Sequence, residues 1–153
     1  MDVRYINPFL KVAVNVLKTM AFVDVSPGKP FLKKEHLAMG DVSGIIGLIG
    51  DVKGSLSVTF DLAMIVTIMK SMLDEEIKEV DNETRDAVGE LTNMISGDAR
   101  RMLQEEGLSL NAAIPTIVSG KDHVIKHVVN GPVIVIPFTC ESGGKASVEV
   151  SLQ

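Results

Sequence analysis

A chain of 153 residues that is 46% hydrophobic fits one domain, residues 1–153, with enough apolar side chains to bury a sizeable core. The formal net charge of −5 and the lack of a basic run exclude general nucleic-acid binding, and no apolar stretch is long enough to span a membrane. The single cysteine, Cys140, cannot form a disulfide within the chain, so cytoplasmic residence is expected.

The first part of the chain predicts a helix followed by a β-hairpin. Residues 3–21 have apolar positions at helical spacing, with Pro8 early enough to be tolerated. Residues 31–39 indicate a short, irregular strand. Residues 42–49 and 54–60 predict two strands joined by a short glycine-flanked connection. In the second strand, Leu56, Val58 and Phe60 alternate with Ser55, Ser57 and Thr59, so we expect one buried face and one face open to water.

Two helices are predicted next, separated by an acidic connection. Asp61 is the expected N-cap of a helix over residues 62–73, which is almost entirely apolar and is therefore expected to be sandwiched between other elements. The connection covers residues 74–82. The longest predicted helix follows over residues 83–106, and Gly107 ends it as a C-cap glycine.

The last part of the chain predicts extended structure. Residues 108–114 and 124–129 are expected to be extended, with Lys126 and His127 exposed, and residues 132–140 form a strand in which Pro137 indicates an edge or a bulge. Val148, Val150 and Leu152 alternate in a closing strand. The order of elements predicts an α+β fold with an antiparallel sheet covered by helices. Its two halves loosely echo each other, with Val12 and Asn15 aligned to Glu90 and Asn93.

The long helix has two contrasting faces. At 100° per residue one apolar stripe forms on the side of the core, consisting of Val88, Leu91, Ile95, Ala99 and Met102. The opposite side carries Asp86, Glu90, Asn93, Gly97 and Arg100. A carboxylate and a carboxamide one turn apart therefore point the same way, off the core.

Other kinds of site find little support in the sequence. His36, His123 and His127 are the only histidines, and we interpret them as solvated surface residues rather than metal ligands. The chain has no nucleophile elbow, phosphate loop or dinucleotide fingerprint, so no cofactor of its own is expected.

The Glu-x-x-Asn pattern occurs twice, and its context separates the two copies. Glu79 and Asn82 lie in the charged connection and are interpreted as solvated linker. Glu90 and Asn93 lie in the middle of a helix, where Asn is unfavourable and nearby glycines each cost about 1 kcal/mol relative to Ala. A carboxamide can orient an attacking water, and a carboxylate can pair with a cation on a partner. Such a pair is typical of half an active site for phosphoryl hydrolysis, completed by a partner that supplies the metal.

At these residues the chain resembles the CheC–CheX–FliY family of bacterial chemotaxis phosphatases. The family pattern appears as Asp86-x3-Glu90-x2-Asn93-x21-Pro115, one residue short of the usual spacing before the proline. The chain length and the one complete motif fit the CheX members best.

The resemblance implies a CheX-like domain that removes phosphate from the phosphoaspartate of a CheY-type response regulator. It implies that Asn93 orients the attacking water and that Glu90 engages the regulator's active-site lysine, with Mg²⁺ held by the regulator. Asp86 and Pro115 would have supporting roles. It also implies a homodimer, for which the edge indicated by Pro137 is mild support. The alternative is a non-catalytic module that docks chemotaxis or flagellar switch proteins.

Overall fold

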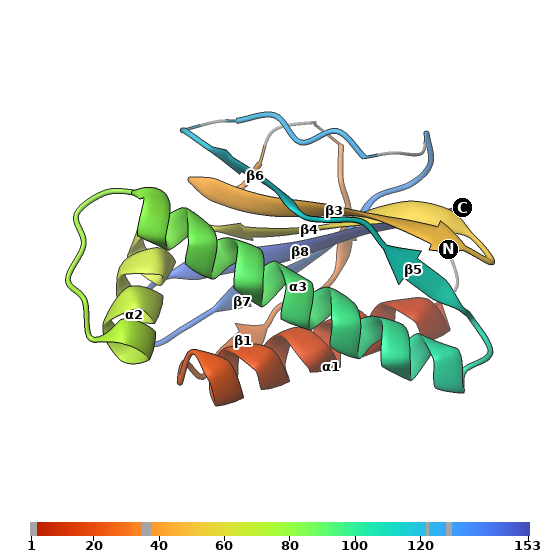
Figure 1. The fold of residues 1–153 in the computed structure, drawn as a ribbon, viewed down its shortest axis with the longest axis horizontal. Coiled ribbons are helices and arrows are strands. Elements are labelled where there is room, and N and C mark those ends of the chain that lie inside the picture. Colours follow the sequence, from red (N-terminus) through yellow and green to blue (C-terminus); the bar gives the residue numbers. More distant parts are fainter. Residues whose placement is uncertain (1–2, 35–37, 122, 128–129) are drawn as a thin grey trace.

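Three helices lie against one antiparallel sheet in a computed structural model, which describes residues 3–34, 38–121, 123–127 and 130–153 (Figure 1). The helices are α1 (Val3–Met20), α2 (Leu62–Leu73) and α3 (Asn82–Glu105). The strands are β1 (Ser26–Pro27), β2 (Phe31–Leu32), β3 (Val42–Gly50), β4 (Lys53–Phe60), β5 (Leu110–Ala112), β6 (Thr116–Ser119), β7 (Ile134–Thr139) and β8 (Lys145–Leu152). The predicted α+β class with an antiparallel sheet is confirmed.

Two hairpins form the centre of the sheet. The strand order is β1-β7-β8-β4-β3-β5, with β2 also pairing with β7 and β6 with β3. The hairpins β3–β4 and β7–β8 meet along β4 and β8, in a register that runs from Gly54 opposite Leu152 to Phe60 opposite Ala146. Each half of the chain thus contributes one hairpin, as two loosely repeated halves would.

The main core lies between the sheet and the helices α1 and α3, which pack against each other across one sheet face (Figure 1). Phe9 of α1, Phe60 of β4 and Leu91 of α3 are all fully buried there. Burial of such side chains stabilises the fold by about 1.5–3 kcal/mol each. Each helix buries the apolar stripe that its periodicity predicts.

Helix α2 is buried on one side only, so the prediction of a sandwiched helix is wrong. Asp61 caps it as predicted, with its side chain accepting from the Met64 N–H at 2.8 Å. Met64 and Ile68 are fully buried, but Val66 and Leu73 are 37% and 43% exposed. The helix lies at one end of the molecule, beyond the ends of the central strands, where only one of its sides has neighbours (Figure 1).

The second face of the sheet is covered, and the prediction that it is open to water is wrong. Ser55, Ser57 and Thr59 are completely buried. The chain after β6 passes over this face (Figure 1), and we call its described residues (120–121, 123–127 and 130–133) the crossing segment. Its side chains hydrogen-bond to the hydroxyls beneath, His123 to Ser43 and His127 to Ser55. Serine and threonine therefore line an interior polar layer rather than a wet surface.

One further expectation about strands fails, and another holds only in part. In residues 124–127, the described part of the predicted strand, Val124 forms only an isolated bridge; residues 128–129 lie outside the described residues. Pro137 is not in an edge strand, because β1 and β2 pair with the outer side of β7, but it does lie opposite a bulge, since residues 136–137 face the three outer residues 28–30. Pro137 has no N–H to donate, but its carbonyl still joins the sheet by accepting from the Gly28 N–H at 2.8 Å.

Candidate functional site

Helix α3 carries the predicted site and has well-formed ends. Asp81 is its N-cap, and its carboxylate accepts from both the backbone N–H and the hydroxyl of Thr84, each at 2.8 Å. These two hydrogen bonds, the backbone one first, hold the pKa of Asp81 below its usual range. At the other end, Gly107 has φ +89° and the Leu108 N–H donates to Leu103 O at 2.9 Å. This is a Schellman motif, and it confirms the C-cap predicted at Gly107.

The two faces of α3 are arranged as predicted. Val88, Leu91, Ile95 and Ala99 are completely buried, and Met102 is partly buried. On the opposite side, Asp86, Glu90 and Asn93 are all exposed. Glu90 and Asn93 are three residues apart and therefore lie on the same helical face, one turn from each other. The structure thus presents a carboxylate and a carboxamide on a helix whose other side is anchored in the core.

Strand β6 runs beside α3 in the opposite direction. Arg85 Nη1 donates to the Ser119 hydroxyl and Arg85 Nη2 to Ile117 O at 3.0 Å. One turn later, a Cβ placed at Gly89 would lie 3.4 Å from Ile117 Cδ1. The glycine therefore lets β6 lie close to the helix.

This antiparallel arrangement extends to the predicted proline. Four helical residues advance about 6 Å, nearly the length of two strand residues. Continuing from Arg85 beside Ser119 and Gly89 beside Ile117, this spacing predicts that Asn93 faces Pro115 one turn later. Glu90 and Asn93 share one exposed helical face, and Pro115 is expected on the same surface.

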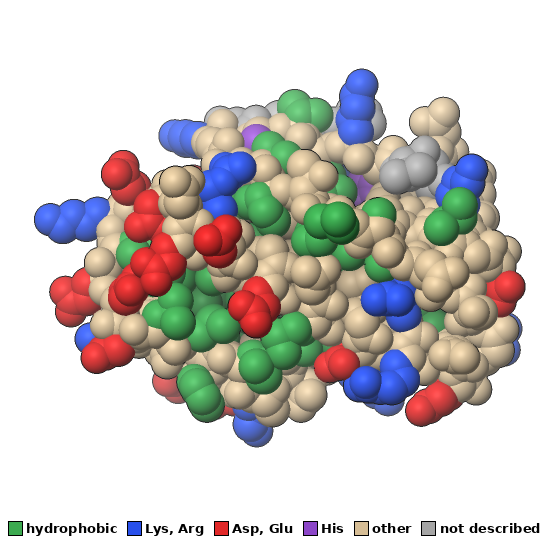
Figure 2. All heavy atoms as spheres, in the orientation of Figure 1, with side chains coloured by type: hydrophobic (Ala, Val, Ile, Leu, Met, Phe, Trp, Pro, Cys, Tyr) green, Lys and Arg blue, Asp and Glu red, His purple; other side chains and the backbone are tan. Residues whose placement is uncertain are grey.

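The N-terminal part of α3 and the connection before it are strongly acidic. Figure 2 shows most of the visible carboxylates gathered at this end of the molecule. The crowding raises the pKa of Glu83, first through a side-chain hydrogen bond with Glu75, then through burial and nearby carboxylates that include Asp86. A partner that binds over α3 therefore meets a negative surface next to Glu90.

The predicted surface histidines are in fact bonded within the fold. His127 has a side chain only 5% exposed, and its Nε2 lies 2.9 Å from Glu149 Oε1. His123 Nδ1 donates to Gly120 O at 2.8 Å, and its Nε2 lies 2.7 Å from the Ser43 hydroxyl. The third histidine, His36, lies outside the described residues. Among the described residues no three His, Cys, Asp or Glu side chains gather as a metal site.

A buried ionic cluster lies beneath the crossing segment. The carboxylate of Glu149, on β8, is fully buried and also accepts from Lys33 Nζ, at 2.9 and 2.8 Å. Burial raises the pKa of Glu149, but the hydrogen bonds from His127 and Lys33, with the charges of both groups, outweigh burial and lower it overall. Sequence reasoning missed this cluster, although a glutamate between Val148 and Val150 in an apolar strand was a visible signal.

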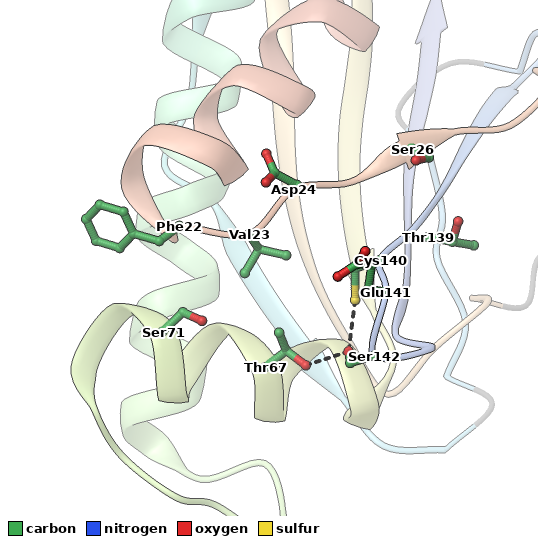
Figure 3. Close-up of a pocket in the computed structure, with 10 residues that line it drawn as sticks. All are labelled: Phe22, Val23, Asp24, Ser26, Thr67, Ser71, Thr139, Cys140, Glu141 and Ser142. Carbon is green, nitrogen blue, oxygen red and sulfur yellow. Dashed lines mark hydrogen bonds between the residues drawn. The ribbon is translucent and has the colours of Figure 1, made fainter.

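A cavity of about 770 Å³ lies away from the Glu90–Asn93 face, between the end of α1, α2 and the β7–β8 turn (Figure 3). Its polar centre is Ser142, whose hydroxyl lies 2.8 Å from Thr67 Oγ1 and 3.0 Å from Cys140 Sγ. Cys140 is partly buried and faces this cavity. The cavity and the predicted site are therefore separate features.

Helix α1 does not contain a second copy of the pair. Asn15 is exposed, but Val12, at the position equivalent to Glu90, is 5% exposed and packs in the core.

None of the described helices is long and apolar enough to cross a membrane.

The architecture matches solved structures of CheC-like proteins. The chain superposes on the crystal structure of a CheC-like superfamily protein from Shewanella sp. PV-4 with a TM-score of 0.92 and 48% identity, covering 100% of this chain and 99% of that one. A chain of the CheX–CheY–BeF3–Mg²⁺ complex from Borrelia burgdorferi matches with a TM-score of 0.80 and 29% identity. The match covers 97% of this chain and 97% of that one. The fold and the exposed pair on α3 therefore define a CheC-like protein.

Sequence comparison assigns the family more narrowly. The model of the family described as chemotaxis phosphatase CheX matches residues 42–139. The CheY-P phosphatase CheX of Thermotoga maritima is 26% identical over 140 residues, which cover 91% of this chain and 89% of the relative. The chain belongs to the CheX family.

Proposed function

We propose that this protein is a phosphatase that hydrolyses the phosphoaspartate of a CheY-type response regulator. The observation that carries the proposal is the exposed position of Glu90 and Asn93, one turn apart on a helix whose other side is buried. Family membership supports it, as do the name of the Thermotoga maritima relative and the CheY component of the Borrelia burgdorferi complex.

Asn93 is the residue we assign to the attacking water. Its carboxamide oxygen accepts a hydrogen bond from the water, which places the water oxygen in line with the bond between phosphorus and the aspartate oxygen. Attack forms the new P–O bond as the aspartate leaves as a carboxylate, and inorganic phosphate is released. Asn93 exchanges no proton in this step. Its contribution is orientation, which a rigid helix supplies better than a loop.

Glu90 is assigned to the regulator's active-site lysine, with which its carboxylate can form a charge-assisted hydrogen bond. The acidic surface around Glu83 and Asp86 favours approach of such a cationic partner. Mg²⁺ in this proposal belongs to the regulator. Asp86 and Pro115 support the site, the first on the same helix face and the second directly before β6, the strand that runs beside α3.

The test is the rate of phosphate release from a phosphorylated CheY-type regulator. Asn93→Ala should abolish acceleration over the regulator's own rate, and Glu90→Ala should reduce it through weaker productive docking. The second Glu-x-x-Asn copy provides matched controls, because Glu79 and Asn82 are also exposed but precede the site. Glu79→Ala and Asn82→Ala should retain activity. Full activity of Asn93→Ala would show that the assignment is wrong.

The alternative is a docking module without catalytic activity. Retention of both Glu90 and Asn93 favours catalysis, because docking alone does not require a water-orienting carboxamide beside the carboxylate. An unchanged rate of phosphate loss with several regulators that bind the protein would favour the docking role. The homodimer that the family resemblance implies stays a prediction, to be tested by light scattering.

A further inference from the structure

Ile114, between β5 and β6, is 87% exposed, more than any other large hydrophobic side chain in the described part of the chain. Single exposed apolar residues are common and require no special explanation. Ile114 is distinguished by two further observations. Its backbone is held firmly on the sheet, and it lies next to the proposed active site.

The backbone at Ile114 forms a bulge on the edge of β3. Leu48 pairs with Ala112 and Ile45 pairs with Thr116. Two residues of β3 therefore face three residues of the outer chain, residues 113–115. The extra residue bends the edge and directs a side chain out of the ladder, as bulges beside active sites do.

The bulge is fixed on both sides of Ile114. The Ala113 N–H donates to Gly47 O at 3.1 Å, which keeps the chain on β3. Pro115 restricts the preceding residue to extended backbone conformations. Ile114 is thus displayed with little freedom, and contacts made by a preorganised group lose little entropy on binding.

Ile114 borders the surface of Glu90 and Asn93. Pro115 follows it directly and leads into β6, whose Ile117 Cδ1 lies 3.4 Å from a Cβ built at Gly89, one turn before Asn93 on α3. Figure 2 shows hydrophobic side chains exposed on this face of the molecule, with the carboxylates concentrated toward one end. A regulator that presents phosphoaspartate to Asn93 must cover α3, and the surface around its phosphorylation site then reaches the β5–β6 bulge.

We propose that Ile114 is an apolar anchor for the phosphorylated response regulator, seated in an apolar depression beside the phosphorylation site. Anchors of this kind contribute most of the affinity of an interface when they are rigid and become fully desolvated. Ile114 thus determines affinity, while Asn93 determines the rate of the bound complex. This inference rests on the proposed function, since it takes the regulator as the occupant.

The test compares Ile114→Ser with Val124→Ser in the full chain. Val124 is a matched control because it is 53% exposed but lies on the crossing segment, on the other side of the sheet. The probe is a CheY-type regulator activated with beryllium fluoride and Mg²⁺, titrated by calorimetry. Ile114→Ser should raise Kd at least tenfold, whereas Ile114→Val and Val124→Ser should change it less than threefold.

Kinetics with the phosphorylated regulator provide a second readout. Ile114→Ser should raise KM about as much as Kd and leave kcat within twofold of the wild type. An unchanged Kd, or a fall in kcat alone, would overturn the anchor. So would a loss of self-association with unchanged affinity for the regulator, because the occupant would then be a second copy.

The two proposals can be told apart. If the wild-type protein binds the activated regulator but does not accelerate phosphate loss, the phosphatase proposal fails and the Kd values still decide the anchor. If the wild-type protein does not bind the regulator, the anchor is overturned as well.

Discussion

Thr92 of α3 packs directly on the bare backbone of Gly44 in β3. A Cβ at position 44 would lie 2.0 Å from Thr92 Oγ1 and 2.9 Å from Thr92 Cβ. Thr92 is fully buried, and its hydroxyl donates to Val88 O at 2.7 Å. Because Thr92 precedes Asn93, the missing side chain at position 44 sets how closely the proposed site approaches the sheet.

Gly44→Ala should therefore destabilise the protein and displace α3. Thr92 Cβ is rigidly attached to the helix, so rotation of the hydroxyl cannot relieve the overlap. Overpacking of this kind costs about 1–3 kcal/mol in the free energy of unfolding. Urea denaturation should show a lower midpoint, and phosphate release from the regulator should slow because Asn93 moves with the helix.

Gly97→Ala is the matched substitution within α3. A Cβ there meets only Arg100 Nη2, at 3.9 Å. Alanine is favoured over glycine in a helix by about 0.5–1 kcal/mol, so this variant should be more stable than the wild type. Equal losses of stability in the two alanine variants would contradict the role given to the Gly44–Thr92 contact.

Arg85→Met should loosen β6 from α3. The substitution removes the hydrogen bonds to the Ser119 hydroxyl and to Ile117 O. Hydrogen bonds that involve a charged group contribute about 1.5–3 kcal/mol, so a loss of about 2 kcal/mol is expected. Hydrogen exchange should speed up in residues 116–119. Arg101→Met is the control, because it removes only an exposed ion pair with Asp98. It should leave hydrogen exchange in residues 116–119 unchanged.

The Glu149 cluster should make stability depend on pH in the acidic range. Its pKa is lowered from 4.5 on folding, because bonds from His127 and Lys33 outweigh the opposing effect of burial. A group with a lowered pKa stabilises the fold above the unfolded pKa, and this contribution is lost as pH falls through the folded pKa. The free energy of unfolding should therefore fall as the pH drops below about 4.5.

Glu149→Gln isolates that contribution. It leaves the charge of Lys33 without its buried partner, so we expect a loss of about 3 kcal/mol at pH 7 and a flatter acid limb in chemical denaturation. Glu141→Gln, at an exposed position, should leave the profile unchanged. If the free energy of unfolding fell equally steeply at acidic pH in the wild type and in Glu149→Gln, the pH dependence would not come from Glu149.

Asp61→Ala should weaken the junction between α2 and β8. One carboxylate oxygen accepts from the Met64 N–H at 2.8 Å and from the Lys145 N–H at 3.0 Å. Loss of an N-cap costs about 1 kcal/mol, and the second bond should bring the total nearer 2 kcal/mol. Asp61→Asn keeps the oxygen and should retain most of the stability in thermal denaturation. If Asn were as damaging as Ala, capping would not be the cause.

The long helix could be predicted because its determinants are local. Asp86, Glu90 and Asn93 share a face through helical periodicity alone, and Gly107 marks the end of the helix in the sequence. The structure places these residues where the pattern predicts.

The polar face of the sheet could not be predicted in the same way. The alternation at Ser57 and Thr59 is the same whether water or protein lies above it, and the cover comes from His123 and His127, more than sixty residues later. The exposure of Ile114 also depends on a distant strand. The bulge at residues 113–115 forms only when both β5 and β6 pair with β3.

The pairing of β4 with β8 has a consequence for how the protein reaches its native state. Ser57 lies opposite Glu149, so the central ladder joins segments from distant parts of the chain. Proteins dominated by such non-local contacts fold slowly, since a long loop must close before the contacts form. During synthesis, the edge of β4 that β8 will cover stays unpaired until the ribosome has delivered β8. This exposed edge is the part of the nascent chain that we expect chaperones to protect.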